Sequence, residues 1–101
     1  MATKKEATNE IRVRADTRHA GALRHAYEIL ENEKTFDHVV VKGAGQGISV
    51  VVNLAELIRR RIKGIHMIMD IVTIQIQEKD TGEIRTHAML KAVLSKVPLD
   101  T

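Results

Sequence analysis

The sequence predicts an α/β fold: a compact two-layer sandwich in the order β-α-β-α-β-β, with two helices on one four-stranded mixed sheet. Three observations predict it. The spacing of apolar residues alternates between a period of two and a period of about 3.6 along the chain. Polar and turn-forming stretches separate these segments. At 101 residues the chain supports a single hydrophobic core, so all the elements belong to one domain.

The predicted domain begins with a strand that follows a polar segment. Residues 1 to 9 carry both charge signs and show no apolar period, so we interpret them as a flexible N-terminal tail. The folded domain then spans residues 10 to 101. From Ile11 to Ala15, apolar and charged residues alternate, which indicates a half-buried strand.

A helix is expected to follow this strand. Asp16 or Thr17 offers a side-chain oxygen as its N-cap. At about 100° per residue, the apolar residues gather on one side of the helix, as expected for a helix lying on a sheet. These residues are Ala20, Ala22, Leu23, Ala26, Tyr27, Ile29 and Leu30.

The middle of the chain predicts a buried strand, a glycine loop and a second helix. The β-branched run within His38–Lys42 is typical of a strand buried on both faces. Glycines then occur at every second position of residues 43–47, and residues 48–62 have helical periodicity. The polar stripe of this helix is only about 60° wide, so more apolar surface is present than one sheet can bury. Either other elements of the chain or a second chain must cover it, and the short chain favours a partner subunit.

The last third predicts a hairpin. Apolar residues alternate over residues 68–77 and 84–94, and Lys79–Gly82 supplies turn-forming residues. The second segment also fits a helical spacing in part. The preceding turn favours the strand interpretation.

The composition limits the possible functions. The chain has no cysteine, which fits a reducing intracellular compartment, cytoplasmic or nuclear, and no apolar run approaches the roughly 20 residues of a membrane span. Its two aromatic residues, Tyr27 and Phe36, cannot form the stacking platform used by many single-strand binders. The net charge of +3 permits a polyanionic partner without requiring one.

The glycine loop is the most specific local feature. It follows a buried strand and begins a helix, where backbone N–H groups and the helix dipole favour an anion. A dinucleotide fingerprint needs a glycine where Ile48 stands, and the Gly-Lys-Ser/Thr sequence of a P-loop is absent. The glycines therefore indicate either close contact with a nucleic-acid phosphate or a sharp turn alone, and Lys42 beside them favours the phosphate.

No motif supports an enzyme, a metal site or a cofactor. The five histidines lack ligand spacing, since His19 and His25 are six residues apart and no carboxylate cluster accompanies them. Ser49 and Ser95 lie in no nucleophile motif. We therefore expect neither a catalytic residue nor a bound metal or cofactor.

One block of the sequence resembles a known family. VVVKGAGQGISVVVNLAELIRRRIKGIH (Val39 to His66), followed by a hairpin and LSKVPLD (Leu94 to Asp100), is similar to the Alba family, especially its eukaryotic branch. That branch includes cytoplasmic RNA-binding proteins and the paired small subunits of ribonuclease P and ribonuclease MRP. The resemblance runs from about Ile11 to the C-terminus and implies the same order of strands and helices.

The resemblance also implies nucleic-acid binding across a dimer. The binding elements would be the turn before the first helix, the glycine loop and the hairpin arm. Arg14, on the polar side of the first strand, joins this set. The candidate binding residues are Arg14, Thr17, Arg18, Lys42, Gly43, Gly45, Gln46, Lys79 and Arg85.

The second helix is expected near the dimer interface, which would account for its surplus apolar surface. The candidate interface residues are Val50, Leu54, Leu57, Ile58 and Arg61. DNA-packaging members of the family carry lysines before the first helix and arginines in the glycine loop. This chain has Asp16 and Thr17 at the first place and Ala44 and Gln46 at the second, which favours moderate or partner-assisted RNA binding.

The leading hypothesis is an RNA-binding homodimer, or one half of a heterodimer with another Alba-like chain. The first alternative is a structural subunit of an RNA–protein complex like ribonuclease P or MRP. The second is a DNA- or chromatin-binding protein. Neither a membrane nor a small-molecule substrate is expected as a partner.

Overall fold

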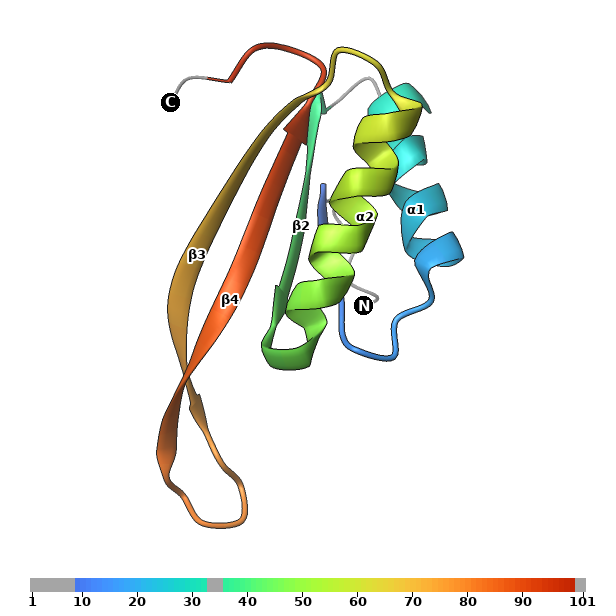
Figure 1. Ribbon diagram of the computed structural model, residues 1–101. Helices are drawn as coiled ribbons and strands as arrows, with labels where there is room; N and C mark the ends of the chain where they lie inside the picture. Colours follow the sequence, from blue (N-terminus) through green and yellow to red (C-terminus); the bar gives the residue numbers. More distant parts are fainter. Residues whose placement is uncertain (1–8, 33–35, 100–101) are drawn as a thin grey trace, which may run out of the picture.

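Two helices lie against one face of a twisted four-stranded sheet in the computed structural model, which describes residues 9–32 and 36–99 (Figure 1). The predicted fold class is confirmed. Along the chain the elements are β1 (Glu10–Arg12), α1 (His19–Tyr27), β2 (His38–Ala44), α2 (Ile48–Arg61), β3 (His66–Gln77) and β4 (Ile84–Ser95). A π-helical turn, η1 (Glu28–Asn32), extends α1, and a 3-10 turn, η2 (Gly45–Gly47), leads into α2.

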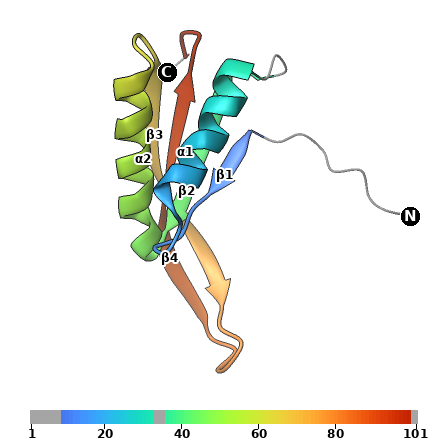
Figure 2. The same ribbon diagram turned by 90° about the vertical axis from the view of Figure 1, so that its right-hand side faces the viewer.

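The sheet has the strand order β1-β2-β4-β3 and is mixed. β1 runs parallel to β2 because α1 crosses over between them, whereas β2 with β4 and β3 with β4 are antiparallel. The apolar run of β2 therefore lies in the middle of the sheet, as its β-branched residues predict. The twelve-residue strands β3 and β4 continue well beyond the helices as an extended hairpin (Figure 2).

The core lies between the sheet and the two helices. β2 and β4 supply alternate residues to it, since successive side chains of a strand point to opposite faces. α2 packs over β2 and β4, and α1 packs beside α2 (Figures 1 and 2). The most deeply buried apolar side chains are Leu30, Val39, Val41, Val51, Leu54, Ile58 and Leu94.

The start of α1 differs from the prediction. Neither Asp16 nor Thr17 caps the helix: the N-cap residue is Arg18, and it makes no side-chain capping hydrogen bond. The Thr17 hydroxyl instead accepts a hydrogen bond from the Arg14 amide at 2.7 Å, and the Thr17 amide donates to the Arg14 carbonyl at 3.1 Å. A threonine before a helix can satisfy either its helix or a local turn, and here the turn uses the hydroxyl.

The first strand is shorter than the alternation predicts. Regular pairing ends at Arg12, although Val13 stays buried and its amide donates to the Lys42 carbonyl at 2.9 Å. Residues 1–8 of the predicted tail lie outside the described residues. Asn9 is held against β2: its carbonyl accepts from the Val40 amide at 2.9 Å, and its amide nitrogen lies 2.9 Å from Nε2 of His38.

Two glycines permit the close packing of β1, β2 and α2. A Cβ atom on Gly43 would lie 2.8 Å from the carbonyl oxygen of Gly47 and 3.0 Å from methyl carbons of Val13 and Val51. A Cβ atom on Gly47 would lie 2.9 Å from the carbonyl oxygen of Val13. Gly45, between them, has φ of +57° and open space around it, so it serves the turn itself. The conformation of the loop thus accounts for its three glycines.

We predict that Gly43→Ala destabilises the fold by about 1–3 kcal/mol, because the added methyl group meets backbone as well as side chains. Gly21→Ala is the matched control. It adds the same methyl group to α1 with nothing within 4 Å, and should stabilise the helix by about 0.5–1 kcal/mol. Urea unfolding followed by circular dichroism measures both values. Equal stability of the two variants would contradict the packing described for Gly43.

Candidate functional site

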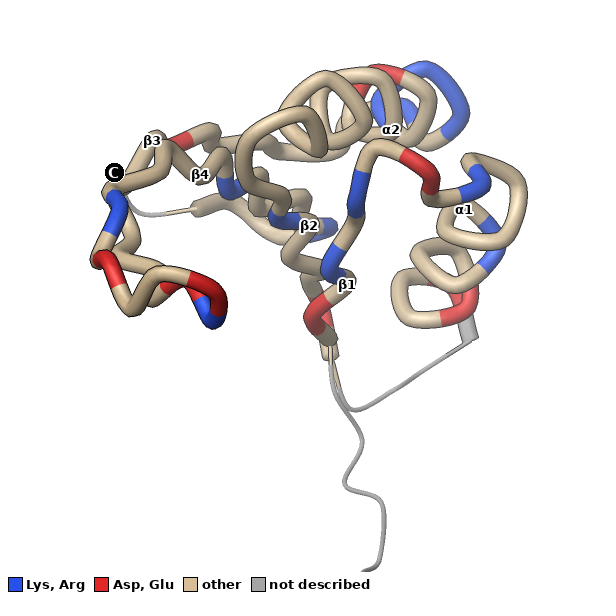
Figure 3. The backbone as a smooth tube through the Cα atoms, turned by 90° about the horizontal axis from the view of Figure 1, so that it is seen from below, with Lys and Arg blue, Asp and Glu red and all other residues tan. Residues whose placement is uncertain are grey.

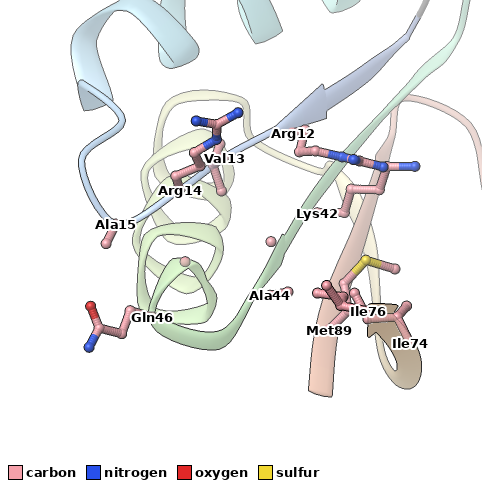
Figure 4. Close-up of a pocket in the computed structure, with 12 residues that line it drawn as sticks. Arg12, Val13, Arg14, Ala15, Lys42, Ala44, Gln46, Ile74, Ile76 and Met89 are labelled. Atoms are coloured by element: carbon pink, nitrogen blue, oxygen red, sulfur yellow. The ribbon is translucent and has the colours of Figure 1, made fainter. Parts of the chain in front are cut away.

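A hollow of about 380 Å³ opens where β2 leaves the sheet (Figure 4). β2 pairs with β4 only as far as Ala44 and Met89. From Met89 toward the tip of the β3–β4 hairpin, the edge of β4 that faced β2 therefore has no neighbouring strand. We call this the glycine-turn hollow. Its lining residues are Arg12, Val13, Arg14, Ala15, Lys42, Gly43, Ala44, Gln46, Gly47, Ile74, Ile76 and Met89.

Three cationic side chains surround this hollow: Arg12, Arg14 and Lys42. Arg12 and Lys42 are register partners on β1 and β2, so they project from the sheet face that the helices leave open (Figure 4). Viewed from below, the basic segments of β1 and β2 lie next to each other (Figure 3). The tertiary structure therefore gathers charges that are scattered in the sequence.

Lys42 is already engaged in an ion pair. Its Nζ lies 2.7 Å from Oε1 of Glu10, and its side chain is mostly buried while that of Glu10 is half exposed. The hydrogen bond from Lys42 is the main reason that the pKa of the Glu10 carboxyl lies below its usual value, and nearby Lys91 and Arg12 lower it further. Glu10 is therefore ionised at neutral pH and occupies the anion-binding position of Lys42.

The turn before α1 fixes the backbone at Arg14. The two hydrogen bonds between Arg14 and Thr17 close this turn. Thr17 thereby serves as a positioning residue for Arg14. Arg18 is exposed at the start of α1 and does not line the hollow. Thr17 and Arg18, which were predicted at this turn, do not line the hollow. Thr17 nevertheless fixes the backbone of Arg14, which does line it.

The glycine turn borders the other side of the hollow. Gly43 and Gln46 line it, and Gln46 is exposed, so its amide can donate and accept hydrogen bonds. Gly45 is exposed at the outside of the turn. The turn leads directly into α2, and the amide of Ile48 at the start of this helix donates to the Gly45 carbonyl.

The hairpin arm carries a balance of charges. Lys79 is exposed at its tip. The Arg85 guanidinium lies 3.2 Å from the Glu78 carboxylate and 3.9 Å from that of Glu83. Residues 78–85 contain three acidic and two basic residues, visible as mixed colours on the hairpin in Figure 3. The arm is therefore less cationic than the rim of the hollow.

The residues predicted for the subunit interface do not form one exposed surface. Val50, Leu54 and Ile58 are buried in the hydrophobic core of the chain itself. The Arg61 guanidinium lies 4.5 Å from the ring centre of Tyr27 on α1, and Leu57, one turn earlier, is on the same side of α2. Only Leu57 and Arg61 of this set remain exposed, and both lie toward α1.

A different apolar surface lies on the other side of α2. We define the apolar strip as the exposed residues Val52, Met69 and Ile71. Met69 and Ile71 are in register with Ala92 and Leu90, so they project from the face of β3 on which the helices lie. α2 covers β2 and β4 but leaves these β3 residues open, and Ile71 is 70% exposed.

Three functional candidates were not predicted from the sequence, namely the apolar strip, Arg12 and Lys91, and the sequence carries a signal for the first two. Both alternating sets of β3 contain several apolar residues, which indicates a strand with apolar side chains on two faces and points to the strip. Arg12 lies on the same strand face as Arg14 in the alternation. Lys91 is the register partner of Lys42 on β4, and only the pairing of the strands reveals it.

Neither a metal cluster nor a membrane-spanning helix occurs in the described part of the chain. Within residues 9–32 and 36–99, no three His, Cys, Asp or Glu side chains lie close enough together to hold a metal ion. Over the same residues, neither α-helix has the length and hydropathy to cross a membrane.

Comparison with known proteins identifies relatives of the chain. The Alba family model matches residues 9–76. The DNA/RNA-binding protein ALBA2 of Plasmodium falciparum is 32% identical over 82 residues, covering 79% of this chain and 37% of that protein. The ribonuclease P protein subunit p25-like protein of Bos taurus is also 32% identical, over 92% of this chain and 63% of its own length. The chain thus spans less than two thirds of either relative.

Solved structures show the same fold at lower identity. Alba from Thermoplasma volcanium superposes with a TM-score of 0.75 at 19% identity, covering 87% of this chain and all of that one. ALBA1 from Trypanosoma brucei has a TM-score of 0.60 at 13% identity, over 91% and 73% of the two chains. The family model, which matches about two thirds of the sequence, and the shared strand and helix order lead to one conclusion: this chain belongs to the Alba family.

Proposed function

We propose that this protein binds RNA as a dimer, through the cations and backbone amides around the glycine-turn hollow. The observation that carries the proposal is the convergence of Arg12, Arg14 and Lys42 beside the glycine turn at the start of α2. Cations beside a turn at the start of a helix suit phosphate oxygens. The names of the relatives, a DNA/RNA-binding protein and a ribonuclease P subunit-like protein, support a binding role.

The charge distribution favours moderate affinity. Lys42 must exchange Glu10 for a phosphate, and Arg85 must exchange Glu78. The loss of each internal ion pair offsets part of the favourable electrostatic free energy of the new phosphate contact. The net charge of +3 provides little long-range attraction. A few short contacts at the hollow therefore contribute most of the binding, with the hairpin arm as an auxiliary element.

A second candidate is a structural subunit that binds RNA only together with another Alba-like chain. The apolar strip favours it, because an exposed apolar surface on one edge of the sheet and one side of a helix suits a protein partner. In both candidates Val52, Met69 and Ile71 form the subunit contact. In the first the partner is a second copy, and in the second it is a different chain.

We expect Arg14→Ala and Lys42→Ala to weaken binding to single-stranded RNA and to lower the log–log salt slope by about 0.7 for each phosphate that is no longer neutralised. Arg60→Ala is the matched control, since it removes an exposed positive charge at the opposite end of α2 (Figure 1). Fluorescence anisotropy at several salt concentrations gives the slopes. A slope that is equally reduced in all three variants would contradict a localised site.

Glu10→Gln should raise RNA affinity about two- to fivefold, because it frees Lys42 from a partly exposed ion pair of modest strength. The same release should occur as the pH falls through the lowered pKa of Glu10, where the stabilising ion pair present at higher pH is lost. Glu56→Gln, which frees Arg59 near the C-terminus of α2, is the control and should leave affinity unchanged. Unchanged affinity of Glu10→Gln would remove Lys42 from the site.

Replacing Ile71 by lysine should raise the dimer dissociation constant about 100-fold, since an uncompensated charge in an interface costs about 3 kcal/mol. The chain should stay folded because Ile71 is 70% exposed. Ile84→Lys, at the hairpin tip and 65% exposed, is the control. Analytical ultracentrifugation measures assembly. A dimeric Ile71→Lys protein would contradict the strip as the interface, and a monomeric unaltered protein would favour the second candidate.

A further inference from the structure

The floor of the glycine-turn hollow is apolar, although its rim is cationic. Ala44, Met89, Ile74 and Ile76 supply the floor, and they come from two strands that pair with β4 and from β4 itself (Figure 4). Ile76 is 42% exposed. A surface that binds only phosphate has no use for such a floor, because phosphates carry no apolar surface.

The hollow exists because β2 stops before its neighbours do. β2 ends at Ala44 and turns away into η2 and α2, whereas β3 and β4 continue their pairing to Gln77 and Ile84. The side chains on the open face of the hairpin beyond Met89 therefore have no strand beside them. The recess is a consequence of the backbone path and is bordered by the turn before α1 and by the glycine turn.

The chemistry of floor and rim together matches one nucleotide. A nucleobase has two flat apolar faces and a polar edge, and its attached phosphate carries a negative charge. Arginine guanidinium groups stack on bases and also bind phosphates, so Arg12 and Arg14 suit both parts. Gln46, at the border, offers an amide that can donate to and accept from a base edge.

The two aromatic residues of the chain cannot stack on a base in this hollow. Tyr27 lies on α1 beneath the Arg61 guanidinium, and Phe36 packs at the edge of the core before β2. Neither lines the hollow. Aliphatic and guanidinium surfaces are therefore what this chain presents to a base at this place.

We propose that the glycine-turn hollow receives one unpaired nucleobase of an RNA strand, with the adjoining phosphate on Arg12, Arg14 and Lys42. The proposal rests on the RNA binding proposed above and adds the form of RNA selected. In a continuous duplex the bases are stacked and paired, so they cannot reach the floor. A bulged or single-stranded nucleotide can.

The test compares two RNA hairpins. One is fully paired, and the other is identical except for a single bulged nucleotide that carries the fluorescent base 2-aminopurine. The unaltered protein should bind the bulged hairpin about tenfold more tightly, which is in the lower part of the range for stacking one base on an aromatic ring, because a guanidinium plane takes the place of the ring here. The fluorescence of the bulged base should change on binding. Equal affinity for both hairpins would overturn the inference alone, whereas binding to neither would overturn the proposed function as well.

Two variants locate the base. Ala44→Leu fills the floor and should abolish the tenfold preference for the bulged hairpin. Ile76→Ser removes an exposed part of the floor and should reduce the preference. Ile84→Ser is its matched control, because Ile84 is the register partner of Gln77, projects from the opposite face of the hairpin and should leave the preference intact. If the preference persists in both Ala44→Leu and Ile76→Ser, the hollow is not the base site.

Discussion

The backbone at Gly43 lies so close to the Gly47 carbonyl and to the methyl groups of Val13 and Val51 that no side chain fits between them. This contact joins β1, β2 and the start of α2 at one point. It fixes where β2 leaves the sheet, and hence where the hollow opens. It also brings Val13 and its neighbour Arg14 against the glycine turn, so that cations from two strands face one space. The position of the candidate site depends on this packing.

The electrostatics of the site are those of partly compensated charges. Glu10 holds Lys42 through a hydrogen-bonded ion pair, and the depressed pKa of this carboxyl shows that it is stabilised in its ionised form by the surrounding cations. Glu78 and Glu83 form ion pairs with Arg85 on the arm. Because a phosphate that binds Lys42 or Arg85 has to replace a carboxylate, the selectivity of the proposed binding has to come from shape and from short contacts more than from the overall field. An apolar floor beneath a cationic rim is suited to that requirement.

Much of the fold could be predicted because local patterns follow from burial. The alternation over residues 84–94 and the continuous run in β2 both reflect which faces of a strand are covered. Which residues of α2 stay exposed for a partner was harder to predict. A helical wheel shows that α2 has more apolar residues than polar ones, but it does not show which of the apolar residues become buried in the chain's own core. Val50, Leu54 and Ile58 are buried in the chain's own core, and the exposed strip is formed by Val52 with β3 residues instead. The N-cap of α1 also differed, because the Thr17 hydroxyl had two possible partners close in sequence.

The sequence by itself determined the order of the elements, the glycine turn between β2 and α2, and the family, because periodicity, turn residues and motif spacing are properties of short segments. Only the tertiary structure decided that Arg12 lies beside Lys42, that Glu10 pairs with Lys42, and that Ile74, Ile76 and Met89 lie under them. These groups come from three separate stretches of the chain, around residues 10–14, 42–46 and 74–89. Strand register and the end point of β2 bring them together, and neither leaves a local pattern in the sequence.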